Sequence, residues 1–294
     1  MRGVQAIDIH ARLVARLTVV VLTLMAVACT APAKAQAPRR APQPGYQFVN
    51  ARAQGPFELQ RWVATAAPDV SPAGMCDCLI LVYEGSRRVV TLGAAGDLTA
   101  ITVEATTGRD INGDGEPDLV VSTWSGGAHC CYTATMYSVG RDTRKVLAVE
   151  TGNCGPGTFE DLNGDGVLEF SSCDDRWADT YCDFASAPMP TVVFAYDAAS
   201  RQYQLATPRF AHALQPLIDS ELVETRTALA TGADRDNGAE KCRVLRPALD
   251  LMYTGRLDEG VALIRGSYRG DDLETFVQQV TTETRSSPLW TAAP

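Results

Sequence analysis

The sequence predicts an α+β fold: a mainly antiparallel β meander, propeller-blade-like or sandwich-like, followed by a small helical C-terminal region. Three observations predict it. Short β-rich runs separated by turn residues fill residues 46–206. The apolar period changes to a helical one after residue 207. At 294 residues, with 46% apolar and 21% charged residues, the chain has the composition of a globular protein.

The β-rich part, residues 46–206, consists of short runs rich in β-branched and aromatic residues with Gly, Asp and Ser between them. In chain order these runs read CLILVYEG, RRVVTL, TAITVEA, DLVVSTW, CYTATMYSV, KVLAVE, LEFSS, TVVFAYD and RQYQLA. Connections this short favour antiparallel neighbours, as in a sandwich or a propeller blade.

The C-terminal part, residues 207–294, shows helical spacing. One stripe comprises Leu257, Val261, Ile264 and Tyr268. A second follows a cap at Asp271 or Asp272 and comprises Leu273, Phe276, Val277 and Val280. A third comprises Cys242, Leu245, Leu249 and Met252, and Pro247 is expected to kink or begin that helix. We interpret these stripes as core rather than as a groove for a partner.

The N-terminus has the features of an export signal. Arg2, Arg12 and Arg16 precede the apolar run LTVVVLTLMAVA, residues 17–28, which is too short to span a bilayer. The small-x-small pattern at residues 33–35 predicts a signal peptide over 1–35, whereas AVAC at residues 26–29 resembles a lipobox and predicts a lipoprotein signal over 1–28. An uncleaved anchor is the third interpretation. The Pro-rich composition of residues 36–45 indicates a linker.

Export leaves the periplasm, the outer membrane (as a lipoprotein) and the medium as predicted locations. Lipidation of Cys29 is the only membrane attachment that we expect. Without Cys29 the chain keeps eight cysteines, an even number that favours disulfides in an oxidising compartment over free or metal-binding thiols. We expect Cys154 to pair with Cys173 around the second acidic loop described below, and Cys182 with Cys242. The neighbours Cys130 and Cys131 should face different partners.

The charge balance excludes one class of partner. Residues 1–35 carry four of the 26 basic residues and one of the 35 acidic residues, so the remainder has 22 basic and 34 acidic residues and a net charge of −12. Nucleic acid requires a basic surface and is therefore not an expected partner. Cations are the expected counter-ligands.

Two acidic loops repeat one pattern: GRDINGDGEPDLVV (108–121) and FEDLNGDGVLEF (159–170). Oxygen-bearing residues occupy alternate positions, and a glycine stands at position 6 of each loop. Calcium takes six to eight oxygens at about 2.3–2.6 Å, which a tightly curled loop of this kind supplies. The predicted ligands of two Ca2+ sites are Asp110, Asn112, Asp114, the carbonyl of Glu116 and Asp118, and then Asp161, Asn163, Asp165, the carbonyl of Val167 and Glu169.

The loops match the first half of an EF-hand loop, but Val121 and Ser172 stand where its closing Glu is required, and the flanks are β-like. DINGDGEPDL (110–119) and DLNGDGVLEF (161–170) resemble instead the calcium loops of the FG-GAP/VCBS repeats, found in integrin α-chains and exported bacterial proteins. The resemblance implies blade-like strands around each loop and calcium ligation by the residues named above. The alternative is an acidic β-turn that holds no ion.

Two other features invite a functional interpretation. The stretch Ser125–Cys131 holds Ser125, His129 and Cys130, which could serve a secreted hydrolase of glycans or phosphoesters, although no orienting acid is evident. Six aromatic residues are expected in the core rather than on a sugar or peptide surface: Trp62, Trp124, Tyr132, Trp177, Tyr181 and Trp290. We therefore expect an exported, calcium-binding, non-catalytic binding or adhesion module whose partner is a protein or glycan of the cell envelope. A secreted hydrolase and a purely structural lipoprotein are the alternatives.

Overall fold

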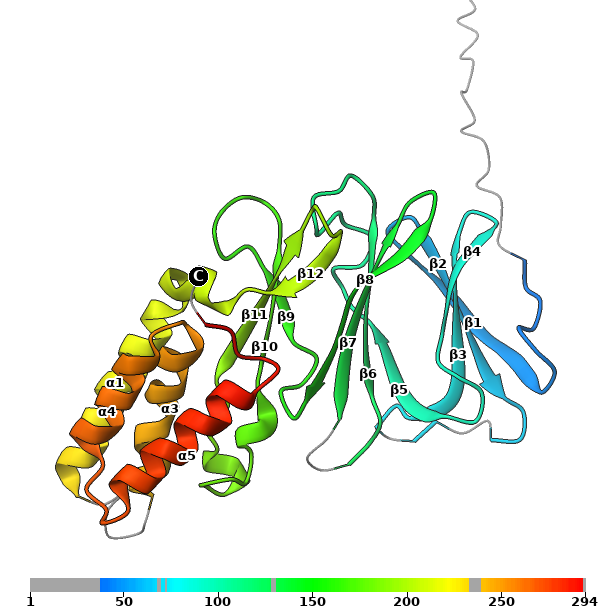
Figure 1. Ribbon diagram of the computed structural model, residues 1–294. Coiled ribbons are helices and arrows are strands. Elements are labelled where there is room, and N and C mark those ends of the chain that lie inside the picture. The colour runs from blue at the N-terminus through cyan, green and yellow to red at the C-terminus, as the bar shows by residue number, and fades with distance from the viewer. Residues whose placement is uncertain (1–37, 68–69, 72, 128–130, 233–238, 293–294) are drawn as a thin grey trace, which may run out of the picture. The chain divides into compact units, whose positions relative to one another are not determined.

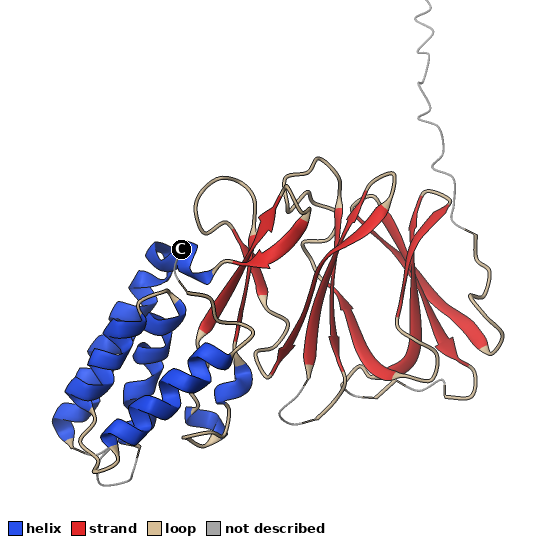
Figure 2. Cartoon of the chain, in the orientation of Figure 1, coloured by secondary structure: helices blue, strands red, loops and turns tan. Residues whose placement is uncertain are grey.

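The computed structural model describes residues 38–67, 70–71, 73–127, 131–232 and 239–292. The expected signal segment, with Cys29, lies outside the described residues, and so do His129 and Cys130. Strands occupy the N-terminal part of the described chain and helices the C-terminal part (Figure 2). The α+β class is confirmed: in the described chain, twelve strands in antiparallel pairings precede four α-helices.

The strands form three successive four-stranded meanders (Figure 1). The first contains β1 (Tyr46–Gln54), β2 (Phe57–Ala64), β3 (Cys76–Glu84) and β4 (Arg87–Leu92). The second contains β5 (Leu98–Val103), β6 (Asp118–Trp124), β7 (Tyr132–Val139) and β8 (Thr143–Gly152). The third contains β9 (Thr158–Glu160), β10 (Glu169–Cys173), β11 (Thr191–Asp197) and β12 (Gln202–Leu205). A short pairing of Cys76 and Asp77 with Thr99 and Leu98 joins the first two meanders into one eight-stranded sheet.

Side-chain alternation along the strands packs the meanders face to face. In β6, Leu119 and Val121 belong to a core shared with Phe57 and Val82 of the first meander. Val120, on the opposite face of β6, belongs to a second core, which it shares with other apolar residues: Met136 of the same meander, Phe170, Val192 and Phe194 of the third, and several from the helices. A strand buried on both faces has a continuous apolar run, which explains the sequence DLVV at its start.

The helical region covers the third meander. It comprises α1 (Ala211–Thr231), α3 (Glu240–Tyr253), α4 (Leu257–Ser267) and α5 (Leu273–Ser286). Short 3-10 turns occur at Asp175–Trp177, Phe184–Ser186 and Thr207–Phe210. Val193 and Ala195, on the face of β11 turned away from the second meander, pack against Phe210, just before α1. The apolar stripes expected on α3, α4 and α5 belong to the core, as predicted, since their buried members pack in one cluster: Leu245, Leu249, Met252, Ile264, Tyr268, Phe276, Val277 and Val280.

Pro247 lies inside α3 rather than at its start. A proline has no N–H for the carbonyl four residues earlier, that of Arg243. This carbonyl instead accepts a hydrogen bond from the hydroxyl of Thr225 on α1, at 3.0 Å. The buried Thr225 therefore satisfies the group that Pro247 leaves free, and this contact joins α1 to α3.

Disulfides form as the sequence predicts. Cys154 pairs with Cys173, and Cys182 pairs with Cys242. Cys76 and Cys78, two residues apart in β3, also form a disulfide, which excludes a metal site or free thiols at this C-x-C motif in the oxidised protein. Cys131 is disulfide-bonded as well. The two predicted pairings link the ends of the second acidic loop's hairpin and tie the β region to α3.

Candidate functional site: two acidic loops

Both acidic loops connect neighbouring antiparallel strands at the same place in successive meanders. The first loop joins β5 to β6, and the second joins β9 to β10. The last predicted ligand of each loop, Asp118 or Glu169, is the first residue of the second strand. The β-like flanks inferred from the sequence are thus strands of one sheet in each case. The sheets therefore fix both ends of each loop.

The two loops share one hydrogen-bond pattern. Oδ1 of Asp110 accepts from the main-chain N–H groups of Gly113 and Asp114, and its Oδ2 accepts from that of Gly115, at 2.8–3.2 Å. In the second loop Asp161 does the same with the N–H groups of Gly164, Asp165 and Gly166, at 2.7–3.2 Å. These bonds lower the pKa of Asp161.

The next ligand position and the glycine at position 6 also match. Oδ1 of Asn112 accepts from the N–H of Asp114 at 3.0 Å, and Oδ1 of Asn163 accepts from the N–H of Asp165 at 2.9 Å. The glycines at position 6, Gly115 and Gly166, have φ of 86° and 88°, a conformation that disfavours other residues. The repeated motif therefore encodes a repeated conformation.

Asp118 carries the feature of the first loop that most favours a cation. Its Oδ2 accepts from the N–H of Ile111 at 2.7 Å and from that of Asn112 at 3.3 Å. Its Oδ1 is buried and has no hydrogen-bond partner among the residues that the structure describes. Burial raises the pKa of Asp118 to about 7, and the charges of Asp114 and Asp110 add to the shift. A divalent cation would satisfy the unpartnered oxygen and oppose this shift.

Glu169 is the counterpart of Asp118 in the second loop. Its Oε2 accepts from the N–H of Leu162 at 2.9 Å, and burial raises its pKa. The residue is only 2% exposed. The longer glutamate thus occupies the same position relative to its loop as the aspartate does in the first one.

The first loop differs by having an internal counter-charge. Oδ2 of Asp114 accepts from the guanidinium of Arg144 at 3.1 Å and from the hydroxyl of Ser138 at 2.7 Å. The equivalent Asp165 accepts at Oδ2 only the side-chain amide of Asn163, at 2.9 Å, among the described residues. Arg144 therefore competes with a cation for the first loop alone.

The donor set of each loop fits calcium: carboxylate oxygens, an amide oxygen and the main-chain carbonyl of Glu116 or Val167 are all hard oxygen ligands. No cluster of three or more His, Cys, Asp or Glu side chains suited to a metal ion occurs in the described ranges. A calcium site here would therefore depend on the amide and main-chain oxygens as much as on the carboxylates.

The loops also lie next to each other. Both line one hollow of about 340 Å3, together with Tyr196, Arg201 and Arg209. The two arginines place positive charge beside the acidic loops. The sequence motif predicts the loops but not this hollow, because its arginines come from the third meander and the 3-10 turn before α1.

The stretch around Ser125 lacks a nucleophilic thiol in its described part. Cys131 is disulfide-bonded, and its carbonyl accepts from the N–H of Ser125 at 3.3 Å.

Two of the tryptophans assigned to the core, Trp62 and Trp177, are buried, 4% and 1% exposed. No helix in the described part of the chain has the length and apolarity of a membrane span.

Comparisons with known proteins give one partial match. No family model and no solved structure matches the chain. A protein described as a probable thylakoid lumen protein of Synechocystis sp. is 30% identical over 81 residues, which are 27% of this chain and 24% of the relative. The chain thus spans about a quarter of that relative's length.

Proposed function

We propose that this protein is an exported, non-catalytic module that binds two calcium ions in its paired loops and presents the surrounding β surface to a protein or glycan of the cell envelope. One observation carries the proposal: two loops with the same hydrogen-bond pattern occupy the same position in successive four-stranded meanders. Ordinary acidic turns have no reason to repeat both the ligand positions and the place in the fold.

The resemblance to FG-GAP/VCBS repeats supports the calcium assignment. Those repeats place D-x-N-G-D-G-x-x-D between two strands of a blade, and here the motif lies between β5 and β6 and again between β9 and β10. The unpartnered Oδ1 of Asp118 supplies independent support, because a buried carboxylate oxygen without a hydrogen bond is costly unless a cation binds it.

Disulfides support the exported location, since they persist in oxidising compartments. The partial match to a protein named for the thylakoid lumen, itself reached by export, points the same way. We propose the periplasm as the location, with attachment through a lipidated Cys29 or release to the medium as variants of the same export route.

The hollow between the loops is the proposed contact surface for the partner. Two calcium ions would fix the conformation of the loops and offset four of the six carboxylate charges of their ligands, and Arg201 and Arg209 beside them would offset the other two. A protein or glycan that carries carboxylates fits this surface, because both arginine and calcium bind carboxylate oxygens.

Calorimetric titration of the chelator-treated protein with calcium tests the proposal. We expect two ions per wild-type chain, one in Asp110→Asn and one in Asp161→Asn, because each aspartate organises one loop. The control Asp258→Asn, an exposed aspartate at the start of α4, should still bind two. Heat that is absent, or unchanged in both loop variants, would refute calcium binding by the loops.

A further inference from the structure

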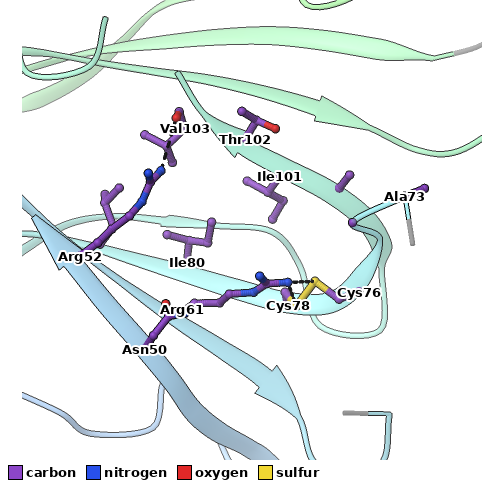
Figure 3. Close-up of a pocket in the computed structure, with 13 residues that line it drawn as sticks. Asn50, Arg52, Arg61, Ala73, Cys76, Cys78, Ile80, Ile101, Thr102 and Val103 are labelled. Carbon is purple, nitrogen blue, oxygen red and sulfur yellow. Dashed lines mark hydrogen bonds between the residues drawn. A yellow bond between two sulfur atoms is a disulfide. The ribbon is translucent and has the colours of Figure 1, made fainter. Parts of the chain in front are cut away.

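A cavity of about 380 Å3 lies between the first meander and β5 (Figure 3), and no residue of the acidic loops lines it. It is large enough for a small organic ligand, since ligand pockets measure about 300–1,000 Å3. Its lining residues are Asn50, Arg52, Leu59, Arg61, Ala73, Gly74, Cys76, Cys78, Ile80, Ala100, Ile101, Thr102 and Val103.

Two guanidinium groups face this cavity, and neither forms an ion pair with an acidic residue of the described chain. Among the described residues, Arg52 donates one long hydrogen bond of 3.5 Å, to the carbonyl of Val103. Arg61 donates to the sulfur atoms of Cys76 and Cys78 at 3.1 and 3.6 Å (Figure 3). Disulfide sulfur is a weak acceptor without charge, so the bridge positions Arg61 but does not neutralise it.

The two carboxylates next in sequence to lining residues, Asp77 and Glu104, are engaged elsewhere. Asp77 lies between the two cysteines of β3, so it points to the other face of the strand, where it accepts from the hydroxyl of Tyr46 and the N–H of Gly96. Glu104 follows Val103 and accepts from the hydroxyl of Ser122. No acidic residue is among those that line the described cavity. The positive charge of the cavity is therefore uncompensated by its own walls.

The remaining wall is largely apolar. Leu59, Ile80, Ile101 and Val103 line it, and Asn50 and Thr102 add neutral polar groups. A hydrated inorganic anion would leave these apolar side chains against water. An organic anion satisfies both halves of the cavity, because its carboxylate binds the guanidinium forks and its hydrocarbon body covers the aliphatic side chains.

We propose that this cavity binds a small organic carboxylate with an apolar body, its carboxylate held between Arg52 and Arg61 and its body against Leu59, Ile80, Ile101 and Val103. The site shares no residue with the calcium loops, so this inference goes beyond the proposed function and does not depend on it. The strand register places the two arginines on one face of the sheet, since Arg52 pairs with Leu59 and Arg61 with Asn50 across β1 and β2.

Titration of the full, oxidised chain with octanoate tests the proposal. We expect saturable one-to-one binding to the wild-type protein and affinity at least about tenfold lower in Arg52→Gln and in Arg61→Gln, which corresponds to about 1.4 kcal/mol. The exposed Arg226, on α1, provides a matched control, and Arg226→Gln should bind octanoate as the wild type does.

Further binding measurements distinguish the contribution of the ligand's charge from that of its apolar body. Octanol and sulfate, which lack the carboxylate and the apolar body respectively, should each bind at least about tenfold more weakly than octanoate. Ile101→Phe fills the cavity without changing its charge and should reduce octanoate binding even if an arginine variant folds poorly. Equal binding of sulfate and octanoate, unchanged affinity in both arginine variants, or no binding of octanoate to the wild type would overturn the proposal.

Discussion

The main-chain N–H of Leu168, in the second acidic loop, donates to the carbonyl of Ile111, in the first, at 2.9 Å. A side chain on Gly113 would lie 2.9 Å from a methyl carbon of Val167, so the loops also touch at their tips. Residues more than 50 positions apart in the sequence thus form one unit. An ion that orders one loop should therefore help to order the other.

This link predicts cooperative calcium binding. Asp161→Asn should lower the affinity of the intact first loop by about fivefold, at the lower end of typical coupling between sites. Asp258→Asn should leave both affinities unchanged. The measurement is a stepwise calcium titration by calorimetry. First-loop affinity in Asp161→Asn equal to that of the wild type would show that the two loops act independently.

Replacement of Arg144 should increase the affinity of the first loop for calcium. Its guanidinium binds Asp114 in the first loop, so it repels an incoming cation and occupies a ligand oxygen. Arg144→Gln should strengthen calcium binding at the first loop by about three- to tenfold at low salt, and less at high salt. Arg141→Gln removes an exposed charge nearby and should have a smaller effect. Weaker binding in Arg144→Gln would mean that the arginine supports the loop.

Loss of either of two disulfides should lower the stability of the protein, but only one of them should affect its affinity for calcium. The Cys182–Cys242 bridge spans 60 residues, so replacing its two cysteines by serine should lower the free energy of unfolding by about 4 kcal/mol. The Cys154–Cys173 bridge spans 19 residues, and the same replacement there should lower it by about 3 kcal/mol. Only loss of Cys154–Cys173, which encloses the second loop, should weaken calcium binding. Denaturant unfolding and calcium titration of the two double variants measure both effects. Equal calcium affinities would contradict the prediction.

A buried pair of carboxyl groups between α1 and α3 predicts a pH dependence. Burial raises the pKa of Glu221 to about 8, and Asp250 adds to the shift, whereas Arg246 opposes it. The folded state therefore keeps a proton that the unfolded chain loses above its ordinary pKa of about 4.5, so stability falls as the pH rises from about 4.5 to 8. Glu221→Gln should remove this loss and stabilise the protein by about 2 kcal/mol at pH 8.

Unfolding at pH 5 and pH 8, with saturating calcium in both buffers, measures the difference between Glu221→Gln and the wild type. The difference should grow with pH. Glu224→Gln, on an exposed neighbour, is the control and should change little. A difference that is constant or shrinks between pH 5 and pH 8 would show that Glu221 is already ionised in the folded protein.

Local patterns in the sequence suffice for much of this structure. The β-rich runs, the spacing of Leu257, Val261 and Ile264 in α4, and the pairing of Cys154 with Cys173 all reflect short-range periodicity or proximity. Helix α1 lies within the region 207–294 that is predicted to be helical, but no apolar stripe marks it, because its apolar positions are irregular and Pro216 interrupts them. The path of α3 through Pro247 depends on Thr225, a contact between helices that periodicity does not reveal.

The candidate sites also combine features that the sequence reveals with features that only the folded structure reveals. Each acidic loop is a continuous segment, so its motif is visible in the sequence, but the contact of Leu168 with Ile111 arises only when the meanders stack. The cavity of Arg52 and Arg61 collects residues from β1, β2, β3 and β5, and no single segment carries its pattern. Of this site, the sequence shows only the C-x-C motif.

Thermal unfolding with and without calcium, for the wild type and Asp118→Asn, tests the central claim most directly. Calcium at about 100 times its dissociation constant should stabilise the wild type by about 2.7 kcal/mol per site, and each kcal/mol raises the melting temperature by about 2–4 °C. In chelator, Asp118→Asn should melt above the wild type, because it removes a buried charge whose Oδ1 has no partner. In calcium it should lose the contribution of the first loop. An equal calcium shift in both proteins, or no shift in the wild type, would contradict calcium binding at Asp118.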